Sequence, residues 1–190
     1  MDSKKFITSS TYSQLLLWDI KGKIIDRWDI THITSICIDS TGEYICVVSG
    51  EKTIQILNLI DKTTVTTYIE NDAIVDMCAS KSHPELMVTY HSNEIRVLHL
   101  LTGKVIGKYT SHNHGKYVVQ GSFGGNNDCF IATGSTDGKI YVWSRSKETL
   151  IQVLEVHEYS PVACVLWNPV DNDMFASASD DGMLCLWGNK

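Results

Sequence analysis

Two sets of histidine, hydroxyl and carboxylate residues near the C-terminal end of the chain have the residue types of a catalytic triad. In each set a Ser or Thr lies ten residues before a Trp, and an Asp lies six residues before it. The sets are His112, Thr133, Asp137 and Trp143, and His157, Ser177, Asp181 and Trp187. A catalytic site has no reason to recur along a chain, whereas a buried chain of bonds from Asp to His, hydroxyl and indole N–H satisfies every polar group. We therefore predict two structural networks and no catalytic residue.

The segments around these sets are internal repeats. Residues 130–143 read FIATGSTDGKIYVW, and residues 174–187 read MFASASDDGMLCLW. Weaker copies end at Leu98, Leu57 and Trp18, which gives a spacing of about 40–45 residues, the period of a β-propeller blade. We expect one domain over residues 1–190, with repeat copies at roughly 5–29, 30–70, 71–110, 111–155 and 156–190.

Each copy is expected to consist of short strands joined by turns. In the last copy, Val162–Trp167 is an apolar run, Asn168-Pro169 begins a turn and Asp181-Gly182 predicts a hairpin. Residues 124–128 (GGNND) are interpreted as a strand-to-strand turn, because no helix follows that could hold a phosphate. No amphipathic helix pattern appears, so the fold class is all-β.

The predicted strands are too few for a closed ring. They number three, then three groups of four, then three, against about 28 in a seven-bladed propeller. We expect a β-propeller segment of about four and a half blades with two open strand edges. Three explanations stay open: a fragment of a longer propeller, a ring completed by two copies, or a small five-bladed ring with missing strands. The mid-blade start favours the fragment, which a monodisperse monomer with a cooperative melt would contradict.

Composition limits the classes of partner. The net charge is −6 and no basic block occurs, which argues against nucleic acids and anionic membranes. No apolar run reaches membrane-spanning length, and no signal-peptide core opens the chain. None of the six cysteines forms a C-x-x-C pair, so we expect buried free thiols and a cytoplasmic protein, with the nucleus as a further compartment. His112-Asn113-His114 lacks further ligands, and no metal or cofactor is predicted.

Partner binding is expected on the loops around one end of the propeller channel. Exposed aromatic residues are the usual anchors of such contacts. His114, Tyr117 and Tyr159 flank predicted strand starts and are our candidates, with ordinary loop residues as the alternative.

With the repeats established, the chain resembles the WD-repeat (WD40) propeller family. The resemblance rests on Trp18-Asp19, on the Ser/Thr-x-Ser-x-Asp-Gly segments that begin at Thr133 and Ser177, and on Trp143 and Trp187. Residues 117–188 further resemble the C-terminal end of the WD-repeat subunit of the GID/CTLH ubiquitin ligase complex. The distinguishing piece is Ser122-Phe123-Gly124-Gly125. Members of that family also have a helical LisH–CTLH region before the propeller, which nothing in this sequence matches.

This resemblance implies a non-enzymatic scaffold or substrate-recruiting subunit of a ubiquitin ligase that acts in proteasome-dependent protein degradation. Its partners would be ligase subunits and degradation substrates, and open blade edges would allow self-association. The alternative is a WD-repeat scaffold of another intracellular complex, in signalling or RNA processing. An enzyme is not expected, because propeller hydrolases and lyases usually need a metal or carboxylate cluster.

Overall fold

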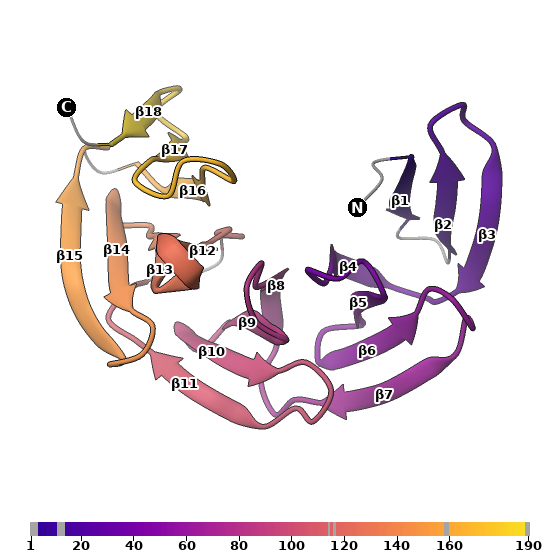
Figure 1. The fold of residues 1–190 in the computed structure, drawn as a ribbon. Helices are drawn as coiled ribbons and strands as arrows, with labels where there is room; N and C mark the ends of the chain where they lie inside the picture. Colours follow the sequence, from indigo (N-terminus) through magenta and orange to yellow (C-terminus); the bar gives the residue numbers. More distant parts are fainter. Residues whose placement is uncertain (1–3, 11–13, 114, 116, 158–159, 189–190) are drawn as a thin grey trace.

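The computed structural model describes residues 4–10, 14–113, 115, 117–157 and 160–188. In this part of the chain, 18 strands form five antiparallel sheets that follow one another along the sequence (Figure 1). The first sheet contains β1 (Lys5–Ser10), β2 (Gln14–Asp19) and β3 (Ile24–Asp29). The second sheet contains β4 (Ile33–Ile38), β5 (Tyr44–Ser49), β6 (Thr53–Asn58) and β7 (Thr64–Ile69).

The remaining three sheets repeat this plan. The third contains β8 (Ile74–Ala79), β9 (Glu85–Tyr90), β10 (Glu94–His99) and β11 (Val105–Tyr109). The fourth contains β12 (Ser122–Gly124), a 3-10 turn η1 (Asn126–Asp128), β13 (Phe130–Gly134), β14 (Lys139–Ser144) and β15 (Thr149–Glu155). The fifth contains β16 (Val162–Trp167), β17 (Phe175–Ser179) and β18 (Leu184–Trp187).

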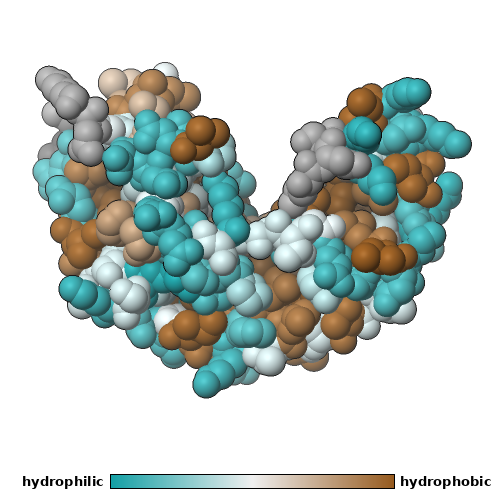
Figure 2. All heavy atoms as spheres, viewed as in Figure 1, coloured by the Kyte–Doolittle hydropathy of each residue, from teal (hydrophilic) through white to brown (hydrophobic). Residues whose placement is uncertain are grey.

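The sheets form an open arc rather than a ring. Strands β4, β8, β12 and β16 lie on its inner side, and β3, β7, β11 and β15 on its outer side (Figure 1). A deep hollow separates the first sheet from the last in the space-filling view (Figure 2). The predicted all-β, incomplete propeller is therefore confirmed.

Apolar side chains hold neighbouring sheets together. All six residues of β9 are buried, because this strand has a sheet on either side. One cluster joins Val48 and Ile54 of the second sheet to Met77 and Val88 of the third. Fully burying such a side chain contributes about 1.5–3 kcal/mol. Because β9 is covered on both faces, buried and exposed residues do not alternate along it.

The outer strands also reach the next sheet at a recurring position. Tyr68 of β7 and Tyr109 of β11 pair with Ile54 and Ile95 at equivalent registers. The Tyr68 hydroxyl donates to the Leu100 carbonyl (3.1 Å), and the Tyr109 hydroxyl donates to the Arg145 carbonyl (2.7 Å). Both acceptors come directly after the third strand of the following sheet, so each phenol bridges one joint of the arc.

The turn between β12 and β13 packs against the fifth sheet. The Trp167 backbone N–H donates to Ser122 Oγ (3.0 Å). The Trp167 indole covers Gly124 so closely that a Cβ there would lie 1.8 Å from Trp167 Cδ2. Gly125 has a φ of +73°, which glycine adopts without strain. The strand-to-strand turn predicted at residues 124–128 is confirmed. Position 124 requires glycine because Trp167 lies so close, and position 125 favours glycine because its φ is positive.

We predict that Gly124→Ala lowers the free energy of unfolding by about 1–3 kcal/mol, the usual cost of overpacking. Trp167 has little room to retreat, because its indole N–H donates to the Asn172 carbonyl (2.8 Å) and its ring packs on Phe175 (5.0 Å between centroids). Urea unfolding followed by tryptophan fluorescence measures the change. The matched control is Gly188→Ala, where the new Cβ would lie 3.6 Å from its nearest neighbour and the cost should stay within about 0.5 kcal/mol. Equal effects of the two substitutions would contradict the packing argument.

Candidate functional site

The fifth sheet brings together His157, Ser177, Asp181 and Trp187. His157 Nδ1 lies 2.8 Å from the Asp181 carboxylate, and His157 Nε2 lies 3.1 Å from Ser177 Oγ. The Trp187 indole N–H donates to Ser177 Oγ (3.0 Å). The backbone N–H of Met183 and, after it, the bond to His157 lower the pKa of the Asp181 carboxyl. The bonds connect the segment before β16 to β17, β18 and the turn between them.

This geometry suits a structural role better than catalysis. Ser177 and His157 are buried, and Ser177 Oγ is bonded to both the imidazole and the indole. A nucleophile must face a substrate, and this hydroxyl faces two protein groups instead.

The corresponding set in the fourth sheet is arranged differently, which corrects the expectation of two equal networks. The Trp143 indole N–H donates to the Thr110 carbonyl (3.2 Å) rather than to Thr133. The Asp137 carboxylate accepts from the Tyr141 hydroxyl (2.8 Å). His112 is buried and packs edge-on against Trp143, with 5.6 Å between ring centroids.

The difference has a local cause. Tyr141 lies two residues before Trp143, at the position that Cys185 occupies before Trp187. The phenol is long enough to reach the turn carboxylate, whereas a cysteine side chain is not. Thr133 Oγ1 is buried and finds no hydrogen-bond partner among the described residues.

Of the three candidate partner-binding residues, Tyr117 lies in the described part of the chain. Tyr117 is 53% exposed and comes shortly before β12. His114 and Tyr159 lie outside the described residues. All three therefore stay predictions.

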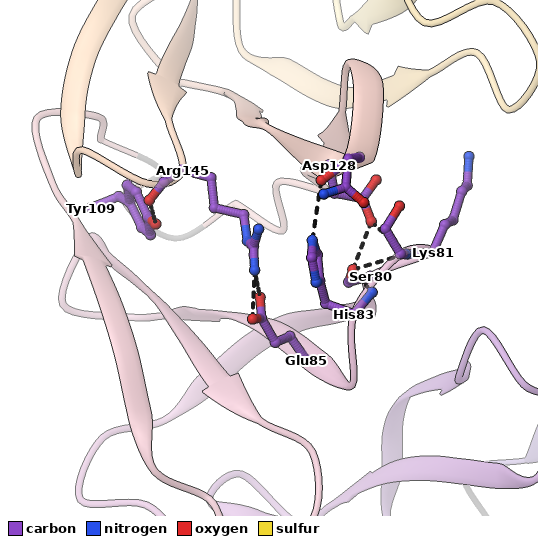
Figure 3. Close-up of polar contacts among 9 residues, drawn as sticks. Ser80, Lys81, His83, Glu85, Tyr109, Asp128 and Arg145 are labelled. Atoms are coloured by element: carbon purple, nitrogen blue, oxygen red, sulfur yellow. Dashed lines mark hydrogen bonds and ion pairs between the residues drawn. The ribbon is translucent and has the colours of Figure 1, made fainter.

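The joint between the third and fourth sheets holds a polar cluster that the sequence patterns did not reveal (Figure 3). Asp128, in η1, is buried and accepts from Ser80 Oγ (2.6 Å) and from the backbone N–H groups of Lys81 (2.7 Å) and Ser82 (2.9 Å). His83 Nε2 lies 3.2 Å from the Asn127 carbonyl. The turn that packs on the fifth sheet therefore also binds the third.

A partly buried ion pair crosses the same joint. The Arg145 guanidinium binds both carboxylate oxygens of Glu85, with Nε 3.0 Å from Oε2 (Figure 3). The Arg145 carbonyl accepts the Tyr109 hydroxyl, so one residue binds two strands of the third sheet. No sequence signal points to this pair, because its members are 60 residues apart and belong to different repeats.

The concave side of the arc contains a cavity of about 380 Å³. It is lined by residues of the inner strands β4 and β8 and of the segment before β12, and Leu166 of β16 and Ser9 of β1 also reach it. Asp76 of β8 lines this cavity and is only 9% exposed. Burial raises the pKa of Asp76 to about 6, although a backbone bond at Met77 and the Ser35 hydroxyl, 3.2 Å away, partly offset this effect.

In the described ranges, no three His, Cys, Asp or Glu side chains gather closely enough to hold a metal ion. No helix described in the structure is long and apolar enough to span a membrane.

Comparison with known families agrees with the repeats and the fold. The model of the WD domain, G-beta repeat, matches residues 103–144 and 148–188, the segments that end in the two strand–tryptophan motifs. Residues 103–188 therefore contain two WD repeats. A solved structure titled "Structure of U3-55K" superposes with a TM-score of 0.81 over 98% of this chain and 58% of that one, at 18% identity, which supports the propeller fold alone.

Curated relatives support the narrower resemblance. The WD repeat-containing protein WDS homolog of Arabidopsis thaliana is 33% identical over 98% of this chain. The WD repeat-containing protein 26 homolog of the same species is 30% identical over 98% of the chain, and GID complex subunit 7 of Schizosaccharomyces pombe is 28% identical over 100%. The chain spans 36%, 32% and 38% of these three proteins, respectively. The chain is thus similar in sequence to GID complex subunit 7 and to two WD repeat-containing proteins.

The unequal networks predict unequal responses to losing a hydroxyl. Ser177→Ala should lower the free energy of unfolding by about 1–3 kcal/mol, because it leaves the buried His157 and Trp187 groups without their partner. Thr133→Val removes a buried hydroxyl that has no partner in the described part of the chain, so it should be neutral or slightly stabilising. Urea unfolding of both variants provides the comparison. Equal destabilisation would indicate that the two sheets use the hydroxyl in the same way.

The buried Asp76 carboxyl predicts a pH-dependent gain from Asp76→Asn. The folded pKa of about 6 exceeds the ordinary value of 3.8, so the stability contributed by the protonated form is present below about pH 4 and lost as the pH rises through 6. The variant should match the native chain near pH 4 and exceed its unfolding free energy by on the order of 2–3 kcal/mol near pH 8. Urea unfolding at both pH values measures this difference. A difference that does not change with pH would show that Asp76 is not the titrating group.

Proposed function

We propose that this chain is a non-enzymatic scaffold or substrate-recruiting subunit of a GID/CTLH-type ubiquitin ligase that acts in ubiquitin-dependent protein degradation. The observation behind the proposal is the match to GID complex subunit 7 of Schizosaccharomyces pombe, which extends over 100% of the chain. The matches to WD repeat-containing protein 26 homologues of Arabidopsis thaliana and Drosophila melanogaster support the same assignment.

The geometry is compatible with a binding role. Loops and inner strands of five sheets face a broad concave surface, on which a partner segment can lie (Figures 1 and 2). The hydroxyl, imidazole and carboxylate groups that resemble a triad are used to hold the fifth sheet together. We accordingly propose a non-enzymatic protein whose partners are other proteins, in the cytoplasm and nucleus.

The turn that distinguishes the narrower family has a packing role here. Ser122 and Gly124 contact Trp167 of the next sheet, and Asp128 binds the loop after β8. These contacts fix the spacing of three consecutive sheets. We infer that the turn marks this group of propellers through the packing of its blades rather than through direct contact with a ligase subunit.

Affinity purification of the tagged chain from its native cells, followed by mass spectrometry, tests the proposal. We expect RING-type ligase subunits to be recovered with the chain. A Tyr117→Ala/Tyr159→Ala double variant should recover less of them if these tyrosines anchor partners. Val170→Ala is the control, because Val170 is exposed and has no predicted role.

The two readouts separate the parts of the proposal. Recovery of a stable complex without any RING-type subunit would contradict ligase membership and favour the scaffold of another assembly. Unchanged recovery with the double tyrosine variant would contradict only the anchor residues.

A further inference from the structure

Asp76 is less well compensated than the other buried carboxylates of the described residues. Asp128 accepts three hydrogen bonds, two of them from backbone N–H groups, and Glu85 pairs with Arg145. Asp39 accepts from the backbone N–H groups of the turn that follows it. The Asp76 side chain has a backbone bond at Met77 and accepts from Ser35 at 3.2 Å, and no Lys, Arg or His side chain of the described residues forms an ion pair with it.

A buried carboxylate without a counter-charge is costly. Removing a charge from water without a counter-charge opposes folding, and the group responds by a raised pKa, here about 6. A fold that only needed to fill this position could use an uncharged residue, as it does at Cys164, which has the same register in the corresponding strand of the fifth sheet. The cost is offset when a cation from outside the chain binds beside the carboxylate.

The cavity around Asp76 defines the form of such a cation. Ser35 lies 3.2 Å from the carboxylate, and the cavity is also lined by the polar side chain of Gln120 and the apolar side chains of Val118 and Leu166. Val118 is 63% exposed and Leu166 is 55% exposed. A long side chain with an apolar stem and a cationic head matches this combination of one carboxylate with polar and apolar neighbours. Guanidinium suits a partly buried pair better than ammonium, because it is more weakly hydrated and binds a carboxylate through two N–H groups.

We propose that the concave face binds a segment of a partner protein by accepting one arginine side chain, whose guanidinium pairs with Asp76 while its stem lies against Val118 and Leu166. The inner strands β4 and β8 that form this site lie at the base of the hollow between the first and last sheets (Figures 1 and 2). The net charge of −6 favours the approach of a basic segment. The inference goes beyond the ligase proposal, because it specifies the chemistry of a ligand and needs no ligase subunit.

Calorimetric titration of the purified chain with two capped pentapeptides tests the proposal. One peptide is Gly-Val-Arg-Val-Gly, and the other has citrulline, the neutral isostere, in place of arginine. At about pH 7.5 the arginine peptide should bind, and the citrulline peptide should bind at least roughly thirtyfold more weakly, as expected when one member of a buried charge pair is lost. No binding of the arginine peptide at about millimolar concentration, or equal binding of the two peptides, overturns the proposal.

Asp76→Asn should weaken binding of the arginine peptide by a similar factor. This variant is expected to fold, because it removes the buried charge and keeps an oxygen that can accept from Ser35; a melting curve verifies it. The matched control is Asp171→Asn, which removes an exposed carboxylate in the turn between β16 and β17. Full affinity in a folded Asp76→Asn variant overturns the proposal, as does an equal loss in the control.

Binding should also follow the ionisation of Asp76. At about pH 5 the affinity of the native chain for the arginine peptide should fall about tenfold, because a carboxyl with a pKa of about 6 is then mostly protonated. The neighbouring thiols Cys37, Cys78 and Cys164 stay neutral over this range, because burial and nearby groups raise the pKa of each. An affinity that is the same at both pH values overturns the assignment to Asp76. Since these titrations use the isolated chain, their failure leaves the ligase proposal standing, and the absence of ligase subunits in a purification leaves this one standing.

Discussion

Each inner sheet of this chain has apolar side chains on both faces, and only neighbouring sheets can cover them. The clusters that include Val88 in the third sheet and Ile131 in the fourth are made in this way. Stability in such an array is approximately a sum over sheets and the joints between them. In the fifth sheet, at the end of the arc, Leu184 and Leu186 of β18 are left 69% and 71% exposed.

Polar groups act on this apolar frame at three kinds of place. At the joints, Asp128 and Arg145 fix how one sheet sits on the next, since hydrogen bonds are directional and apolar contacts are not. Within the fifth sheet, His157 connects strands that are already paired. On the concave face, Asp76 accepts from Ser35 of the second sheet but has no counter-charge among the described residues, which is why we infer a cationic ligand there.

Features that repeat along the chain could be predicted from the sequence, and features that join unrelated positions could not. The period, the strands and the turn at residues 124–128 depend on local patterns, and the structure has them where the patterns place them. The predicted hydrogen-bond partners of Asp137 and Trp143 are wrong. A tyrosine at position 141 bonds to the Asp137 carboxylate, and the Trp143 indole donates to the Thr110 carbonyl instead. The pairing of Ser80 with Asp128 spans 48 residues and depends on how two sheets pack, which no local pattern records.

The joints of the arc should differ in stiffness. The Glu85 ion pair and the Asp128 bonds cross the joint between the third and fourth sheets, so bending there must stretch several directional bonds at once. An ion pair across the first joint connects Lys62 to Asp26, and its lysine side chain is 58% exposed and can follow a moving carboxylate. Under load, the third and fourth sheets should move as one rigid plate while curvature changes near the first sheet. The concave face would then widen or narrow mainly from its N-terminal arm.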